Sequence, residues 1–179
     1  MRSRQPLPDT WLMTDERLGD GLLAAVGRLP PGAGIVFRHY SLGPAERLAQ
    51  FERVRAASSG RDLMLLLAGP AAVARAWGAD GSHGRGRGPG LRSGPAHDQK
   101  EIRAAEKAGA DLVFLSPVFA TRSHPGARPL GRVQFGLLAR ATSLPVIALG
   151  GMDAARGESL RALGAYGWAG IDAWTNVGN

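Results

Sequence analysis

Short apolar runs alternate with amphipathic stretches along nearly the whole chain. Runs of strand length, rich in aliphatic and aromatic residues, predict eight β-strands, at 11–14, 34–40, 62–69, 79–84, the far end of 84–94, 111–119, 145–151 and 165–174. Apolar residues with helical spacing predict helices at 21–28, 44–57, 70–78, 98–110, 132–142 and 154–163. This alternation predicts parallel strands joined by helical crossovers.

Local signals mark the ends of two of these helices. Pro44 begins one helix, whose apolar positions 48, 51 and 54 share a face. Asp98 is the expected N-cap of another, with Glu101 three residues later and Gly109 at its C-terminal end. The segment 84–94, by contrast, is rich in Gly and Arg and predicts a loop.

Two architectures fit eight such units, an open doubly wound sheet and a closed barrel. Eight similar units favour closure, and 179 residues leave roughly 22 for each unit. We therefore predict an α/β fold, a compact (β/α)8 TIM barrel with one shortened or missing helix around 84–94. Residues 1–179 are expected to form a single domain.

Composition narrows the functional classes. The 44% hydrophobic content excludes wholesale disorder, and the absence of cysteine excludes disulfides, thiolate catalysis and Cys-ligated zinc. No apolar run is long enough to span a membrane, and no apolar segment follows the charged N-terminal residues as in a secretory signal. A cytoplasmic protein without membrane contact is the expectation.

The net charge of +7 raises nucleic acid as a partner. The 22 basic residues are almost all Arg, with Lys only at 100 and 107, and they are scattered rather than clustered. An ordinary basic surface is favoured, because electrostatic footprints for nucleic acid are usually clustered. An Arg-rich nucleic-acid binder remains the least favoured alternative.

Polar residues and glycines stand where most of the predicted strands end. These positions are Asp15, Arg38 with Tyr40, His83, His97, Ser116, Gly150–Gly151 and Asp172. Because active sites of TIM barrels lie at the carboxyl ends of the strands, this pattern predicts a ligand site. The alternative is that strand ends are polar simply because they meet solvent.

Phosphate is the first candidate ligand. Gly150–Gly151 would let backbone N–H groups approach an anion after the seventh strand, although a tight turn explains the pair equally well. Arg85, Arg87 and the basic segment 121–132 could close over a phosphorylated ligand, or be solvated loops.

The four histidines, at 39, 83, 97 and 124, are too dispersed for a typical metal site. His83 and His97 follow neighbouring strands and could act together on a substrate proton, while a structural role is the alternative for each.

Several stretches together resemble the thiamine-phosphate synthase/TenI superfamily of small (β/α)8 barrels over nearly the whole length. They are LMTDER (12–17), FRHY (37–40), WGADGSHG (77–84), PAHDQKE (95–101), AGADLVFLSPVFATRSHPG (108–126), PVIALGGM (145–152) and LGAYGWAGIDAW (163–174). The resemblance implies thiamine biosynthesis, with joining of a pyrimidine diphosphate to a thiazole phosphate, and Mg²⁺ as cofactor.

The resemblance also shows departures at the diphosphate and metal positions. The family's Gln-x-Arg-x-Lys falls on Val36, Arg38 and Tyr40, so only the Arg is kept. Its Asn-Asp pair falls on Leu67 and Ala68, and Ala68 has no oxygen ligand for Mg²⁺.

Other departures concern the thiazole phosphate side. The family's Thr-x-Thr-Lys loop is 121–124 here, with His124 in place of Lys and Arg122 as a substitute charge. Its Val-Ser falls on Ile171 and Asp172, and a carboxylate there would repel a phosphate. Pro117 stands where the TenI branch of isomerases has its His, which makes isomerisation the less favoured enzyme reaction.

These observations favour a synthase-like transferase with a degenerate diphosphate and Mg²⁺ site. A non-catalytic, regulatory or altered-substrate barrel that binds a phosphorylated ligand is the alternative. The predicted catalytic residues are His83, His97 and Arg38, and the predicted substrate and phosphate ligands are Arg38, Tyr40, Thr121, Arg122, His124, Gly150, Gly151 and Asp172, with no metal ligand. The expected partner is a small phosphorylated substrate, and a homodimer is left open.

Overall fold

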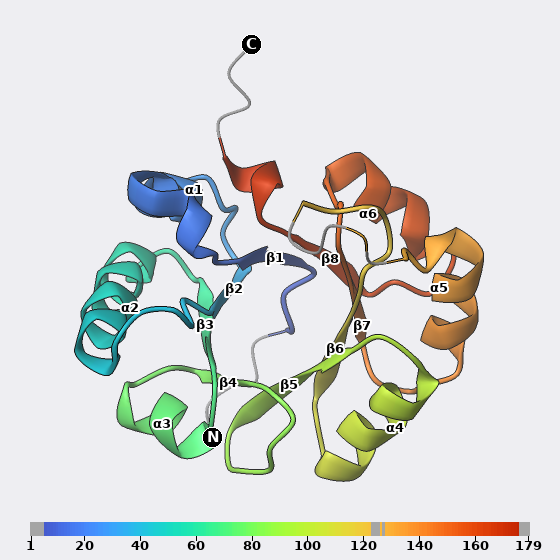
Figure 1. Cartoon of the computed structure of the whole chain (residues 1–179), viewed down its shortest axis with the longest axis horizontal. Helices are drawn as coiled ribbons and strands as arrows, with labels where there is room; N and C mark the ends of the chain where they lie inside the picture. The colour runs from blue at the N-terminus through green and yellow to red at the C-terminus, as the bar shows by residue number, and fades with distance from the viewer. Residues whose placement is uncertain (1–5, 123–125, 127, 176–179) are drawn as a thin grey trace.

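A computed structural model describes residues 6–122, 126 and 128–175. Eight parallel strands form a closed barrel in sequence order, with helices around the outside (Figure 1). The strands are β1 (Thr10–Met13), β2 (Gly34–Phe37), β3 (Met64–Ala68), β4 (Gly81–His83), β5 (Leu91–Ala96), β6 (Leu112–Leu115), β7 (Val146–Leu149) and β8 (Gly167–Gly170). The predicted TIM barrel is confirmed.

Within the described residues, six α-helices and two 3-10 helices join or follow the strands. They are η1 (Glu16–Gly21), α1 (Leu22–Gly27), α2 (Pro44–Ser58), α3 (Ala71–Ala76), α4 (Gln99–Ala108), α5 (Gly131–Arg140), α6 (Ala154–Arg161) and η2 (Asp172–Trp174). The side chain of Asp98 accepts a hydrogen bond from the Glu101 N–H at 2.8 Å, and Gly109 is left-handed at φ 77°, so α4 begins and ends where its caps predict.

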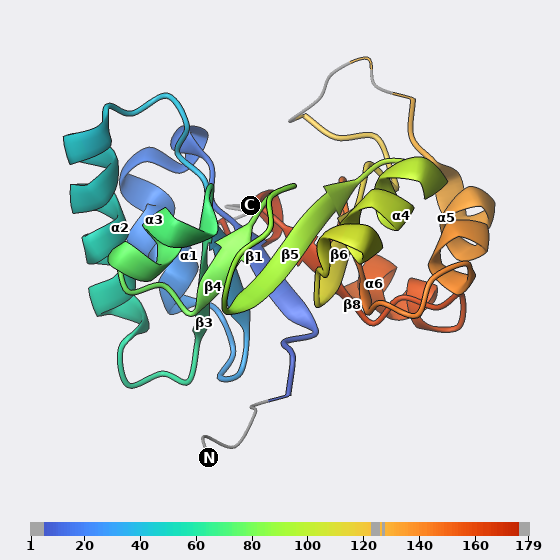
Figure 2. The same cartoon turned by 90° about the horizontal axis from the view of Figure 1, so that it is seen from below.

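The connection between β4 and β5 is a loop, residues 84–90, as the sequence predicts (Figure 2). Two arginines fasten this loop to α4: Arg85 forms an ion pair with Glu101 at 2.6 Å, and Arg87 donates to the Lys107 carbonyl at 2.8 Å. The barrel wall is therefore covered here by an arginine-anchored loop where the other crossovers carry a helix.

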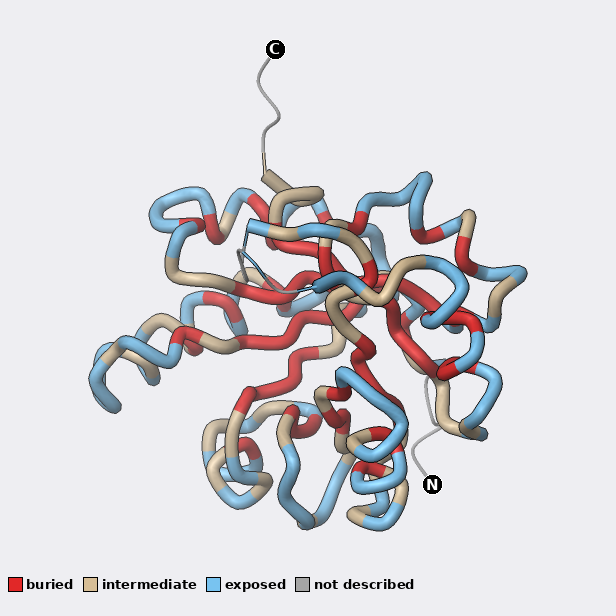
Figure 3. The backbone as a smooth tube through the Cα atoms, turned by 45° about the vertical axis from the view of Figure 1, so that its right-hand side comes forward, coloured by how far each residue is buried: buried red, intermediate tan, exposed pale blue. Residues whose placement is uncertain are grey.

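The core fills the barrel and the layer between strands and helices (Figure 3). Trp11 and Phe114 meet edge to face inside the barrel, with ring centroids 5.3 Å apart. Gly34 is required beside them, because a Cβ there would lie 2.1 Å from the Trp11 ring. β1 pairs with both β2 and β8, placing Leu12 opposite Ile35 and Gly170, and this last pairing closes the barrel.

Several strands are shorter than their apolar runs. The predicted eighth strand continues to Trp174, but β8 ends at Gly170 and Asp172–Trp174 form η2. The predicted second strand reaches Tyr40, but β2 ends at Phe37, and His39 takes a positive φ of 43°. In both places the chain turns away just where polar side chains begin, which moves those side chains onto the rim of the barrel. Among the described residues, no helix is long and apolar enough to cross a membrane.

Candidate functional site

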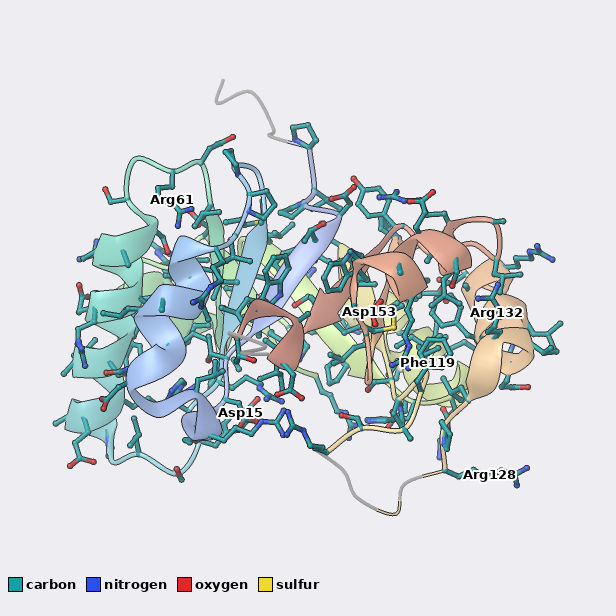
Figure 4. All side chains as sticks on the ribbon, turned by 90° about the horizontal axis from the view of Figure 1, so that it is seen from above. Asp15, Arg61, Phe119, Arg128, Arg132 and Asp153 are labelled. Atoms are coloured by element: carbon teal, nitrogen blue, oxygen red, sulfur yellow. The ribbon has the colours of Figure 1, made fainter. Side chains whose placement is uncertain are left out.

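The best-defined cavity opens at the carboxyl ends of the strands, mainly β6, β7 and β8. Its volume is about 240 Å³, slightly below the roughly 300–1,000 Å³ typical of small-molecule sites. The lining residues are Arg17, Arg38, Ser116, Pro117, Ala120, Thr121, Arg122, Leu149, Gly150, Gly151, Met152, Ala169, Gly170, Ile171 and Asp172. We call this cavity the β6–β8 pocket; its size suits one small ligand. Figure 4 shows Asp15 and Arg128 at this end of the barrel and Arg61 at the other.

Gly150 and Gly151 form the floor of the pocket beside the loop that follows β6. Their φ angles are 98° and 62°, and a Cβ on either would come within 2.8 Å of Pro117 or 2.5 Å of the Ala120 carbonyl oxygen. The Phe119 N–H donates to the Gly150 carbonyl at 3.1 Å. The glycines therefore allow the β6 loop to pack closely against the end of β7, and this packing shapes one wall of the cavity.

Three guanidinium groups face the pocket, and carboxylates pair with all of them. Arg38 forms an ion pair with Asp15 at 2.7 Å and donates from Nε to the Thr14 carbonyl at 2.7 Å. Asp172 lies between the other two, at 3.6 Å from Arg17 and 3.1 Å from Arg122. The pocket thus has an excess of positive charge, suited to an anion, with a carboxylate on its wall.

Six of the residues predicted from the sequence line this pocket together: Arg38, Thr121, Arg122, Gly150, Gly151 and Asp172. Tyr40, His83 and His97 are outside its lining, and His124 lies outside the described residues. The functional roles of these residues remain predictions, but the grouping is the one expected of a single site.

The two histidines predicted to act as a pair have separate partners. His83 is buried, 2.9 Å from the Ser93 hydroxyl, and edge to face with Phe114. Burial, with a smaller contribution from the Arg38 charge, lowers the pKa of His83 to about 4, so its ring is neutral near pH 7. His97 is half exposed and lies 2.7 Å from Glu101. His83 therefore belongs to the packed interior and His97 to the start of α4.

Arg47 of α2 occupies the space between the ends of β2 and β3. It donates to the Arg38 carbonyl at 2.8 Å and to the Ala68 carbonyl at 2.6 Å. Its guanidinium also lies over three aromatic rings, those of Phe37, Tyr40 and Trp77, at 5.6–5.9 Å from each centroid. The Arg47 guanidinium thus fills the barrel mouth at the ends of β2 and β3.

The same contacts test whether Mg²⁺ fits the position that the family resemblance implies. Ala68 has no side-chain oxygen, and its carbonyl accepts a hydrogen bond from the positively charged Arg47. Within the described part of the chain, no group of three or more His, Asp or Glu side chains is placed to hold a metal ion. The described residues at this position do not fit Mg²⁺.

Sequence reasoning missed two arginines. Arg17 is the third residue after the predicted strand 11–14 and belongs to the LMTDER stretch, so its position on the rim could have been predicted. Arg47 lies inside a predicted helix, where a charged residue in the first turn normally reads as solvated surface. Only the turn of 38–43 brings Arg47 back over the ends of β2 and β3.

Comparison with known proteins gives consistent results. Residues 94–174 match the family model described as thiamine monophosphate synthase. The chain is 33% identical to a thiamine-phosphate synthase of Methanoculleus marisnigri, over 96% of this chain and 89% of that one. It is 41% identical to a thiamine-phosphate synthase of Salinispora tropica over 46% of this chain and 40% of that one. Thiamine phosphate pyrophosphorylase from Pyrococcus furiosus has the same fold, with a TM-score of 0.78 at 23% identity over 95% of this chain and 88% of that one.

Proposed function

The chain belongs to the thiamine monophosphate synthase family, and from that premise we propose that its β6–β8 pocket binds one small phosphorylated molecule of the thiazole phosphate or thiamine phosphate class. The observation that carries the proposal is the convergence of Arg17, Arg38 and Arg122 on a single cavity at the carboxyl ends of the strands. Arginine is well suited to phosphate because its planar fork donates two parallel hydrogen bonds.

The rest of the pocket supports the same class of ligand. Leu149, Met152 and Ile171 give it apolar walls that suit a small ring. Thr121 adds a hydroxyl next to Arg122 on the β6 loop, so a phosphate and a ring could be held by different walls of one cavity.

A second candidate function is the complete coupling of a pyrimidine diphosphate to a thiazole phosphate. Arg38 and Arg47 favour it, because both place positive charge at the end of β2, where a diphosphate would need compensation. This route uses the chain's own guanidinium groups, because the Ala68 position does not fit a metal.

Isothermal titration with hydroxyethylthiazole phosphate and with thiamine phosphate tests the binding proposal. We expect saturable binding of at least one compound with one site per chain, and at least about tenfold weaker binding by Arg122→Ala. Arg132→Ala is the matched control, because Arg132 contacts Ser159 outside the pocket. If neither compound binds the well-folded protein, the proposal is wrong.

An assay for thiamine phosphate formation from both phosphorylated substrates then separates the two candidates. Turnover that disappears with Arg38→Ala would establish coupling. Binding without turnover would leave a ligand-binding barrel.

A further inference from the structure

Asp172 places a negative charge on the wall of a pocket that otherwise attracts anions. Its two carboxylate oxygens face different arginines, Oδ1 toward Arg17 at 3.6 Å and Oδ2 toward Arg122 at 3.1 Å. Arg17 comes from the segment after β1 and Arg122 from the loop after β6, so the carboxylate joins two sides of the pocket. The Asp172 side chain is 42% exposed and lines the pocket.

These contacts make Asp172 a resident counter-ion of the arginines that would bind a phosphate, shared at Arg17 with Asp15, which also lies 3.6 Å away. A phosphate group that engages Arg17 and Arg122 takes over the contacts that Asp172 now makes. Arg38 gives little further compensation, because Asp15 already pairs with it at 2.7 Å. After the exchange, the Asp172 carboxylate and the phosphate are neighbours of like charge, which opposes binding.

A cationic group on the ligand removes this repulsion. Placed a few ångströms from its own phosphate, such a group would meet the carboxylate that the phosphate has displaced. Two protein ion pairs are then replaced by ligand–protein ion pairs, and no charge in the pocket is left without a partner. A neutral phosphate ester of the same shape lacks this compensation.

We propose that Asp172 makes the β6–β8 pocket selective for phosphate esters that also carry a cationic group, and so makes it discriminate against neutral phosphate esters of equal size. The proposal rests on the proposed function, since it concerns the ligand of the same pocket. Within the thiazole class it assigns the preferred ligand to the positively charged thiazolium form, as in thiamine phosphate, over the neutral thiazole phosphate. Asp172 acts here as a specificity-determining residue.

A pair of isosteric probes isolates the charge. Phosphocholine carries a quaternary nitrogen, and 3,3-dimethylbutyl phosphate has a carbon in its place. At low ionic strength we expect titration calorimetry to show at least about tenfold tighter binding of phosphocholine by the unaltered chain, a difference of about 1.4 kcal/mol. For Asp172→Asn we expect this preference to fall within about twofold, mainly because the neutral ester gains affinity.

Asp20→Asn is the matched control, because Asp20 is an exposed carboxylate of η1 outside the pocket lining. It should keep the full preference, while Asp172→Ser, a second variant, should behave like Asp172→Asn. Equal binding of both probes by the unaltered chain, or an unchanged preference in both Asp172 variants, would overturn the proposal.

The same comparison with thiamine phosphate and hydroxyethylthiazole phosphate separates this inference from the proposed function. If both compounds bind equally well, the pocket has its proposed ligand class and the role of Asp172 is wrong. If none of the four compounds binds, the proposed function and the inference fail together.

Discussion

The polar groups at the strand ends have different surroundings on the two sides of the barrel mouth. On the side of β6–β8, the strand ends carry two glycines and line a cavity, which Arg122 faces together with Arg17 and Arg38 from the ends of β1 and β2. On the side of β2–β4, the polar groups are satisfied within the protein: Arg47 bonds two strand carbonyls, and His83 bonds Ser93. One side keeps an open cavity, and the other is filled by side chains.

This difference shows that strand ends in one barrel can either line a cavity or be covered by side chains. The ends of β2, β3 and β4 are packed and hydrogen-bonded by the protein's own side chains, among them Arg47 and His83. Ligand affinity should therefore depend on the residues that line the β6–β8 pocket, and stability on the packed groups Arg47 and His83 of the β2–β4 side.

The largest effect is expected from Gly151→Ala, which would close the open side. The new Cβ would lie 2.5 Å from the Ala120 carbonyl oxygen at a φ of 62°, so the β6 loop must move. We expect a loss of roughly 2–4 kcal/mol in the free energy of unfolding and at least about tenfold weaker phosphate-ester binding. Denaturant unfolding and calorimetry measure the two effects.

Gly60→Ala provides the control for the backbone cost alone, since Gly60 has a φ of 73° and open space around its Cβ position. It should lower stability by about 1–2 kcal/mol and leave ligand binding unchanged. If Gly151→Ala behaves like Gly60→Ala, close packing of the glycine pair does not shape the pocket.

On the β2–β4 side, titration of His83 should make the free energy of unfolding depend on pH. The pKa of His83 is about 4 in the folded protein because of burial, against about 6.5 in an unfolded chain. Between these values the unfolded chain takes up a proton that the folded one does not, so stability is full above pH 6.5 and falls toward pH 4. The loss reaches about 3 kcal/mol.

Urea unfolding at a series of pH values checks this expectation, with His83→Gln for comparison. The variant should be less stable near pH 7 but should show a shallower decline below pH 6.5. Parallel curves for the two proteins would mean that His83 does not cause the decline.

Arg47→Ala tests whether the filled side serves stability rather than binding. It removes two charged hydrogen bonds to strand carbonyls and three contacts with aromatic rings. We expect unfolding to become easier by about 2 kcal/mol, with phosphate-ester affinity changed by less than about twofold. Arg53→Ala, on the same helix but exposed and bonded to Gln50, should change stability by less than about 0.5 kcal/mol.

The smallest effect is expected from Tyr40→Phe. Tyr40 is 65% exposed, covers Arg47 with its ring and lies outside the β6–β8 pocket. Removal of its hydroxyl should change both stability and affinity very little, by less than about 0.5 kcal/mol. A tenfold loss of phosphate-ester binding in calorimetry would instead mean that Tyr40 contacts the ligand, as the sequence predicts, and that the site extends across the barrel mouth.

The sequence predicted the barrel well because its signals are local and repeated. Alternating apolar runs, the caps of α4 and the helix-free segment 84–94 each act through neighbouring residues. Strand ends were less predictable, since the apolar run of β8 continues past Gly170 while the chain already turns into η2. Hydrophobicity does not distinguish a strand from an apolar turn that packs on the core.

The site was predictable only in part. Gly150–Gly151 and Arg38 follow from strand-end positions, Arg122 follows from the family resemblance of segment 121–124, and the structure places all of them in one cavity. The contact of Asp172 with Arg17 and Arg122 could not be predicted, because it joins segments far apart in the sequence. His83 and His97 are separated because their side chains point to different partners, Ser93 and Glu101. The direction of a side chain is difficult to predict from the order of residues alone.

The pairing of β8 with β1 determines how substitutions that hinder barrel closure would affect the protein. Until that pairing forms, β1 and β8 are edge strands with unpaired N–H and C=O groups, which can recruit strands of other chains. The pairing also joins distant parts of the chain, so it carries a high loop-closure cost. Substitutions at Gly167, where a Cβ would collide with the Asp9 carbonyl, should therefore appear first as aggregation during expression rather than as weaker ligand binding.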